Sequence, residues 1–70
     1  MNRTLVTSSD ILSIGHDPQS GVLEVEFISG DVYEYFDVPV YLYRQFLQSS
    51  LHGQFLNDYI RYNYRYKKIN

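Results

Sequence analysis

The residues best suited to chemistry in this sequence lie near its end, in the stretch RYNYRYK from Arg61 to Lys67. Tyrosines alternate there with basic or amide side chains, and the candidate ligand-binding set is Arg61, Tyr62, Tyr64, Arg65, Tyr66 and Lys67. Lysine and arginine neutralise phosphates, and arginine can do so through two parallel hydrogen bonds. Tyrosine rings stack on bases, each for about 1–3 kcal/mol at single-stranded sites. We therefore expect this stretch to bind a phosphate-bearing, nucleotide-type ligand, with Asn57 and His52 supplying polar contacts beside it.

The same stretch has a plainer interpretation, which the sequence leaves open. Runs of charge are often only a solvated surface, and tyrosine rings fill the cores of small domains. Eight of the 70 residues are tyrosines and four are phenylalanines, so the chain has rings enough for a core and for a site. The sequence does not decide between packing and binding.

Charge is distributed unevenly along the chain, although the net charge is only −2. Residues 1–40 carry one arginine and seven carboxylates, net −6, whereas residues 41–70 carry five cations and one aspartate, net +4. A grip on a long nucleic acid comes from many phosphate contacts and usually shows as a clear basic excess. The four cations between residues 61 and 68 suit one or two phosphates better. We expect a small nucleotide or the end of an RNA as the partner, and not a DNA duplex.

The sequence does not contain the patterns typical of catalytic or metal sites. No serine lies in a G-x-S-x-G elbow, and neither a P-loop nor a G-x-G-x-x-G motif occurs. There is no cysteine, and His16 and His52 lack the spacing of metal ligands. His52 follows Ser49 and Ser50, but that arrangement is more typical of a helix-ending turn than of a catalytic pair. We therefore expect a non-enzymatic protein without a metal or a cofactor.

Two further classes of function fit the same residues. An RNA-binding accessory module would bind longer oligonucleotides more tightly and would lose affinity steeply with salt. A protein–protein adaptor would add a strand to a partner's sheet through its C-terminal segment or a strand edge. Because 70 residues without a disulfide are marginal alone, we expect a homo-oligomer, and such an assembly could act by sequestering its ligand.

Length and hydropathy indicate where the protein works. No apolar run approaches the roughly 20 residues that a membrane span needs. The first ten residues, MNRTLVTSSD, lack the apolar stretch of a signal peptide. We expect a cytoplasmic protein that forms one domain over residues 1–70.

Alternation of apolar and polar residues predicts three strands. They are Ile11–His16, Val22–Ile28 and Asp31–Phe36. Between the last two, a two-residue loop would place Glu34 on the apolar face, whereas a three-residue loop with left-handed Gly30 would place Tyr33 and Tyr35 there. We prefer the three-residue loop because it buries rings rather than a carboxylate, which makes this tyrosine pair core more than site. The glutamates of these strands then form a solvated outer face.

The segment after the strands predicts two helices. Asp37 is an N-cap residue type, Pro39 suits a first helical turn, and apolar residues then recur at three- and four-residue steps from Val40 to Leu47. The stretch from Ser49 to Gly53 ends this helix after about three turns, with glycine in the turn. A second, shorter helix is predicted over Gln54–Ile60, with its inward side chains at Phe55, Tyr59 and Ile60.

The C-terminal stretch is compatible with strand, helix or disorder. As a strand it places Tyr62, Tyr64 and Tyr66 on one face, which the alternation favours. As a helix it forms a stripe of Tyr59, Tyr62 and Tyr66, and chain ends also fray. The predicted fold class is α+β: a small three-stranded antiparallel meander packed against one longer and one short helix, with the C-terminal segment as a candidate further strand.

Four blocks of the sequence occur in a suggestive order and spacing. They are SSDILSIGHD, LEVEFISGDVYEYFDVP, YLYRQFLQSS and HGQFLNDYIRYNYRY. The most specific part is Tyr33-Glu34-Tyr35 followed by Val38-Pro39, and the next is the block from Gly53 to Arg61. Over nearly the whole chain this pattern resembles the KTSC domain family, which is named for its occurrence at the C-terminus of some lysyl-tRNA synthetases.

The resemblance implies the fold pattern above and a nucleotide-related ligand, because RNA binding has been suggested for the family from its synthetase context. Two positions depart from the pattern. His16 stands where an aromatic residue such as tyrosine is common. Leu51-His52 stands where a small residue and a base are frequent, which weakens the expectation of a phosphate site at that turn.

Overall fold

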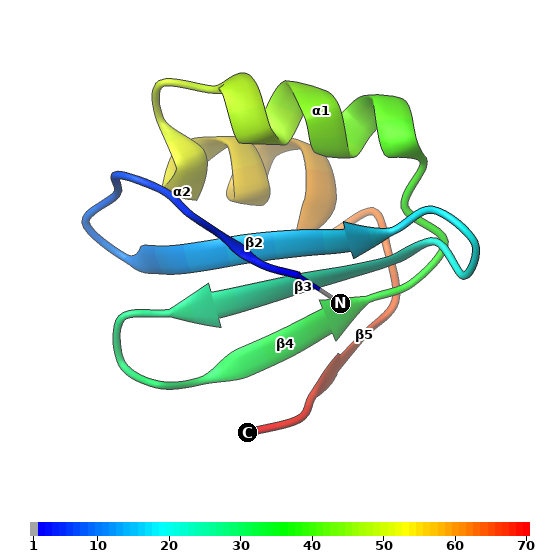
Figure 1. The fold of residues 1–70 in the computed structure, drawn as a ribbon, viewed down its shortest axis with the longest axis horizontal. Coiled ribbons are helices and arrows are strands. Elements are labelled where there is room, and N and C mark those ends of the chain that lie inside the picture. The colour runs from blue at the N-terminus through cyan, green and yellow to red at the C-terminus, as the bar shows by residue number, and fades with distance from the viewer. Residues whose placement is uncertain (1) are drawn as a thin grey trace.

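The computed structural model describes residues 2–70 and consists of one antiparallel sheet with helices on one of its faces (Figure 1). The sheet has five strands in the order β1-β2-β3-β4-β5. The strands are β1 Thr4–Leu5, β2 Ile11–Asp17, β3 Val22–Phe27, β4 Val32–Tyr35 and β5 Tyr66–Lys68. The helical elements are α1 Val40–Gln48, α2 His52–Phe55 and η1 Leu56–Ile60, the last a single π-helical turn. The α+β class is confirmed, and within residues 2–70 no helix has the length and apolar character needed to cross a membrane.

The predicted three-strand meander is present as β2, β3 and β4, and the sheet extends beyond it on both sides. β5 pairs antiparallel with β4, so the candidate C-terminal strand is confirmed. This strand begins only at Tyr66, because the chain turns at residues 61–64, and the continuous strand that would carry Tyr62 and Tyr64 is therefore wrong. The sequence pattern does not reveal β1, since two exposed residues carry no alternation.

The hairpin between β3 and β4 has the predicted three-residue loop. Val25 lies opposite Tyr33, and the Phe27 amide donates to the Asp31 carbonyl at 2.8 Å. Gly30 adopts the left-handed conformation that this loop needs, with φ of 98°. The register turns Tyr35 onto the apolar face, where only 3% of its surface is exposed.

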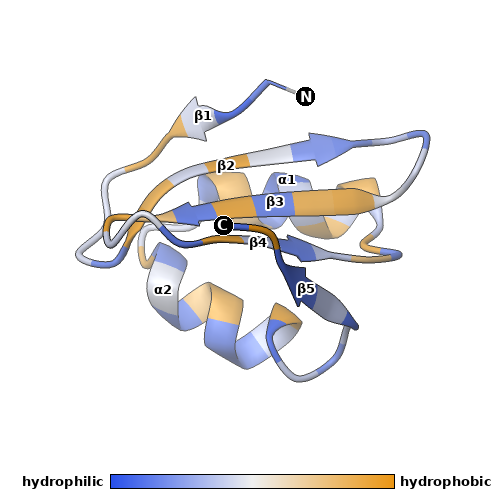
Figure 2. Cartoon of the chain, turned by 90° about the horizontal axis from the view of Figure 1, so that it is seen from below, coloured by the Kyte–Doolittle hydropathy of each residue, from blue (hydrophilic) through white to orange (hydrophobic). Residues whose placement is uncertain are grey.

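The core lies between the apolar face of the sheet and the helices. Seen from below, α1 lies behind β2 and β3, whereas α2 lies toward the β4–β5 side (Figure 2). Strands β2 and β3 bury Ile14, Leu23 and Val25, α1 buries Phe46, and η1 buries Ile60. The two helical segments thus lie over different parts of the sheet, with α2 and η1 on the β4–β5 side (Figure 2).

The start of α1 differs from the prediction. The helix begins at Val40 with Pro39 as its N-cap, and no side chain caps it, so Asp37 is not the N-cap residue. The backbone of Asp37 is instead left-handed, with φ of 60°. This conformation brings the Val38 amide to the Gly21 carbonyl at 2.9 Å, which joins the helix start to the β2–β3 turn.

The second helix is also different in detail. It begins at His52, so Gly53 lies inside the helical segment rather than in the turn before it. From Leu56 the chain forms the π-turn, in which the Arg61 amide donates to the Leu56 carbonyl at 2.8 Å. A π-turn holds more residues than an α-turn and rotates the following side chains. Within the turn, Leu56 and Ile60 are buried, whereas Tyr59, predicted to point inward, is 54% exposed.

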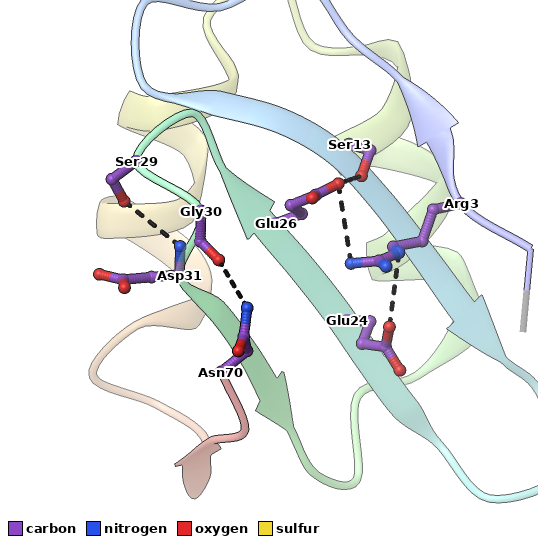
Figure 3. A network of polar contacts seen from close by, with 8 residues as sticks. All are labelled: Arg3, Ser13, Glu24, Glu26, Ser29, Gly30, Asp31 and Asn70. Carbon is purple, nitrogen blue, oxygen red and sulfur yellow. Dashed lines mark hydrogen bonds and ion pairs between the residues drawn. The ribbon is translucent and has the colours of Figure 1, made fainter.

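The outer face of the sheet carries a polar network rather than free carboxylates (Figure 3). Arg3 approaches Glu24 at 3.5 Å and Glu26 at 3.8 Å. The Ser13 hydroxyl donates to Glu26 at 2.8 Å. The glutamates of β3 thus lie on the side of the sheet away from the helices, as the alternation predicts.

Candidate ligand-binding site

A cleft of about 530 Å³ opens between the α2–η1 segment and the helix-covered face of β4 and β5. Its wall carries Gly53, Asn57 and Arg61. Its floor carries Tyr33, Tyr35 and Tyr66. Small-molecule sites in proteins are concave, measure about 300–1,000 Å³, and combine apolar surface with a few placed polar groups. The cleft meets that description.

The wall residues are spaced four apart, so that one face of the helical segment is turned toward the floor. The π-turn, Leu56–Ile60, includes Asn57 and ends just before Arg61. Single π-turns inside helices are rare and occur frequently at functional sites. The Arg61 Nη1 donates to the Asn57 Oδ1 at 3.2 Å, which holds the guanidinium beside the cleft.

The floor is formed by three tyrosine rings from two neighbouring strands. Tyr35 lies opposite Tyr66 across the β4–β5 pair, with ring centroids 5.9 Å apart. The ring centroids of Tyr33 and Tyr66 are 5.8 Å apart. Burial raises the pKa of Tyr35, and the nearby Arg61 charge opposes the shift only in part. The Tyr35 hydroxyl therefore remains a neutral hydrogen-bond donor at the edge of the core.

One end of the cleft is acidic. Asp10 and Asp31 line it together with Ser29, and the Ile28 amide donates to the Asp10 carbonyl at 2.8 Å. The Asp31 carboxylate lies 3.5 Å from the Lys68 ammonium. Among residues 2–70, no ion pair or side-chain hydrogen bond involves the Asp10 carboxylate. The opposite end carries Arg61, so the site has a positive and a negative end.

The structure brings together only part of the predicted ligand-binding set. Arg61, Asn57 and Tyr66 line the cleft. Arg65 does not, because its Nη2 lies 3.5 Å from the Asp37 carboxylate and its guanidinium lies 5.9 Å from the Phe36 ring centroid.

The remaining side chains of the C-terminal stretch point elsewhere. Lys67 pairs with Glu34 across the β4–β5 register, on the outer face of the sheet. Tyr64 is half-buried against the core, and Tyr62 is 81% exposed beside the Arg61 guanidinium. The four-cation cluster expected from the sequence is therefore dispersed.

The two histidines make contacts within the protein and do not line the cleft. His52 is buried against Phe46, and its Nε2 donates to the Leu47 carbonyl at 3.2 Å. It lies beside the cleft without lining it. His16 donates from Nε2 to the Val38 carbonyl at 2.7 Å. No group of three or more potential metal ligands lies together within residues 2–70.

Sequence reasoning missed several residues of the cleft. Tyr33 and Tyr35 were expected in the core, and both also form the floor of the site. No sequence pattern marks Asp10 and Asp31, the aspartates of the acidic end. The available signal was the Tyr-x-Tyr pattern: this motif and the block from Gly53 to Arg61 face each other across the cleft.

Comparison with known proteins gives one family. The family model described as the KTSC domain matches residues 7–64. The crystal structure of a KTSC domain protein from Yersinia pestis superposes with a TM-score of 0.94 at 35% identity, covering 99% of this chain and 97% of that one. An uncharacterised protein of Stutzerimonas stutzeri is 37% identical over 70 residues, 99% of each chain. A lysine–tRNA ligase of Nostoc is 30% identical over 61 residues, which are 87% of this chain but 11% of the ligase.

Proposed function

The chain belongs to the KTSC domain family, and on that premise we propose that it is a non-enzymatic module whose cleft binds a compact, nucleotide-type, phosphate-bearing ligand. One observation carries the proposal: a guanidinium, Arg61, stands beside three tyrosine rings in a cleft of ligand size. Among residues 2–70, Arg61 makes none of the ion pairs. Its charge is therefore available to an anion.

The chemistry of the site matches that ligand class. A guanidinium binds phosphate oxygens through two parallel hydrogen bonds, which are stronger than neutral ones. The tyrosine rings offer flat apolar surface, and base–aromatic stacking contributes about 1–3 kcal/mol. A nucleotide combines a phosphate with a flat ring, so that one ligand can use both features.

The non-enzymatic part of the proposal rests on the contents of the cleft. The polar side chains of the lining are three tyrosines, two serines, one asparagine, one arginine and two aspartates. The glutamates bound to Arg3 lie on the opposite face of the sheet. No activated nucleophile is paired with a base there. Incubating purified protein with nucleotides should leave them intact. Turnover of nucleotides by the purified protein would overturn this part.

We further propose that the module works in the cytoplasm as a homo-oligomer that sequesters its ligand. Support comes from large apolar side chains that remain exposed in the single chain, among them Leu5 at 74%, Leu51 at 62% and Tyr62 at 81%. A 70-residue domain without a disulfide commonly gains stability by oligomerising, which would bury such side chains. Native mass spectrometry should give a mass above one subunit, and a monomer in dilute solution would refute this arrangement.

A nucleotide panel measured by thermal shift and calorimetry tests the binding function. We expect particular mononucleotides to raise the melting temperature, since a ligand that binds only the folded state stabilises it. Arg61→Ala should weaken binding by about tenfold to a hundredfold, because a charge-assisted hydrogen bond contributes roughly 1.5–3 kcal/mol. Arg44→Ala is the matched control, because Arg44 is equally charged and exposed on α1 but does not line the cleft.

An RNA end is the second candidate ligand. It is favoured by the similarity to part of a lysine–tRNA ligase, a protein whose name specifies an RNA substrate. This alternative predicts affinity that rises with oligonucleotide length and falls steeply with salt. If no nucleotide or RNA changes the melting temperature, the protein–protein adaptor class becomes the better explanation, and removal of residues 61–70 should then abolish partner capture.

A further inference from the structure

The floor and the wall of the cleft both run from an acidic end to the Arg61 end. On the floor, the chain runs from Asp31, just before β4, through Tyr33 to Tyr35 in β4. On the wall, the helical segment runs from Gly53 through Asn57 to Arg61. At 3.3–3.4 Å per residue, the Asp31 and Tyr35 ends of the floor are about 13 Å apart. The two ends can therefore contact different parts of one small ligand.

The Arg61 end carries the positive charge of the cleft and several hydrogen-bond donors. The guanidinium donates, and the Tyr35 phenol stays protonated because burial raises its pKa. Tyr66 completes this end from β5. A group that accepts several hydrogen bonds and carries negative charge fits here, as a phosphate does.

The opposite end offers acceptors. The Asp10 carboxylate is exposed and lacks an ion-pair partner among residues 2–70, whereas Asp31 is paired with Lys68. A side-chain carbon added at Gly53 would lie 3.6 Å from the Asp10 Oδ2, at ordinary contact distance, so the carboxylate lies beside Gly53 where both residues line the cleft. An ionised carboxylate accepts hydrogen bonds and repels phosphate. This end therefore requires a donor group on the ligand.

We propose that the cleft binds a nucleoside monophosphate in one orientation, with its phosphate at Arg61, its base over the Tyr33 ring and an exocyclic amino group of the base at Asp10. The inference rests on the proposed function and specifies its ligand. A nucleotide carries its phosphate and the amino edge of its base at opposite ends, with the ring between them. Adenine and cytosine present such amino donors, and a carboxylate is a suitable acceptor for them. Hypoxanthine and uracil have no exocyclic amino group.

A crossed set of variants and ligands tests the orientation. Calorimetry would measure AMP, IMP, CMP, UMP and adenosine against the unmodified protein, Asp10→Asn and Arg61→Ala. We expect the unmodified protein to prefer AMP over IMP, and CMP over UMP, by about tenfold, since one specific base contact contributes roughly 1–3 kcal/mol. Asp10→Asn should reduce this preference to about twofold or less. The asparagine amide also donates, so it no longer selects for a donor group on the base. Arg61→Ala should instead remove the preference for AMP over adenosine and keep the preference for AMP over IMP.

Asp58→Asn is the control. It removes one exposed carboxylate from η1, part of the segment that carries the cleft wall, without changing the cleft lining. Melting temperatures without ligand establish that each variant folds. Equal affinity of the unmodified protein for AMP and IMP, with AMP binding still dependent on Arg61, would overturn the orientation and leave the proposed function intact. An absence of binding by every mononucleotide would overturn both.

Discussion

Tyr35 belongs to the core and to the cleft at the same time. Its ring is packed among buried residues, and only 3% of its surface is exposed. Burial penalises the charged phenolate, which raises the pKa of Tyr35 above 10.0, while the Arg61 charge lowers it in part. The pKa of Tyr43 is raised for the same main reason. Both hydroxyls are thus harder to ionise in the folded protein than in the unfolded chain.

This difference predicts a loss of stability in alkali. Below pH 10 both states keep the Tyr35 proton, and the full stability is present. As the pH rises above 10, the unfolded chain releases the proton first, so the free energy of unfolding falls until the pH passes the folded-state pKa. Urea unfolding between pH 8 and pH 11 should show the decline, and Tyr35→Phe should reduce its slope. The same slope in Tyr35→Phe would contradict the assignment, and Tyr62→Phe, which alters an exposed ring, serves as the control.

The availability of each cation depends on contacts that the sequence cannot display. Arg61, Asn57 and Tyr66 could be selected from residue type and spacing alone, and all three line the cleft. Arg65 has the same type and nearly the same place in the sequence, yet it pairs with Asp37, which is 28 positions away. Residue chemistry therefore suggests which class of ligand to propose, whereas long-range pairing decides which cation lines the cleft.

At the scale of elements, Asp37 determines where α1 begins. Its φ of 60° lies in the left-handed region, where side chains other than glycine, asparagine and aspartate are disfavoured. The left-handed turn brings Val38 to the β2–β3 turn, whose Gly21 is also left-handed with φ of 76°. The hydrogen bond between the two turns holds the start of α1 against the β2–β3 end of the sheet.

Substitutions at Asp37 should separate backbone strain from charge. Asp37→Ala is expected to lower the free energy of unfolding by about 1–2 kcal/mol, because alanine tolerates the left-handed region poorly. Asp37→Asn also removes the exposed ion pair with Arg65, but asparagine accepts the conformation, so the loss should stay below about 0.5 kcal/mol. Urea unfolding monitored by circular dichroism gives both values. If the two variants lose equal stability, the charge and not the backbone is responsible.

The elements that could be predicted are those with a strong local pattern. The three-residue hairpin loop follows from one comparison, because the alternative would have buried Glu34 in place of two rings. β1 has no such pattern: it approaches β2 because Gly15 lacks a side chain, and an added carbon would lie 2.6 Å from the Asn2 carbonyl oxygen. The π-turn has no local signature either, because its buried residues Leu56 and Ile60 are four positions apart, as in an ordinary α-helix.

At the scale of the whole molecule, folding brings the basic and acidic parts of the sequence together. The chain has a net −6 in residues 1–40 and a net +4 in residues 41–70. The β4–β5 pairing lays the basic end against the acidic half, where Lys68 meets Asp31 and Lys67 lies opposite Glu34. These contacts reduce the positive field of the C-terminal stretch. Under the proposed function, the remaining positive charge serves one local phosphate contact rather than an extended polyanion.

Salt dependence should therefore distinguish the small ligand from RNA. Each cation that displaces condensed counterions from a single strand contributes about −0.7 to the slope of log affinity against log salt concentration. An RNA held by three cations would lose roughly 20-fold in affinity from about 50 to about 200 mM salt. A mononucleotide held by Arg61 should lose about threefold or less, because only one close pair is screened. Calorimetry measures the salt dependence of AMP binding, and fluorescence anisotropy with labelled oligonucleotides of increasing length measures that of RNA binding. A steep slope that grows with oligonucleotide length would favour the RNA-binding module over the small-ligand module.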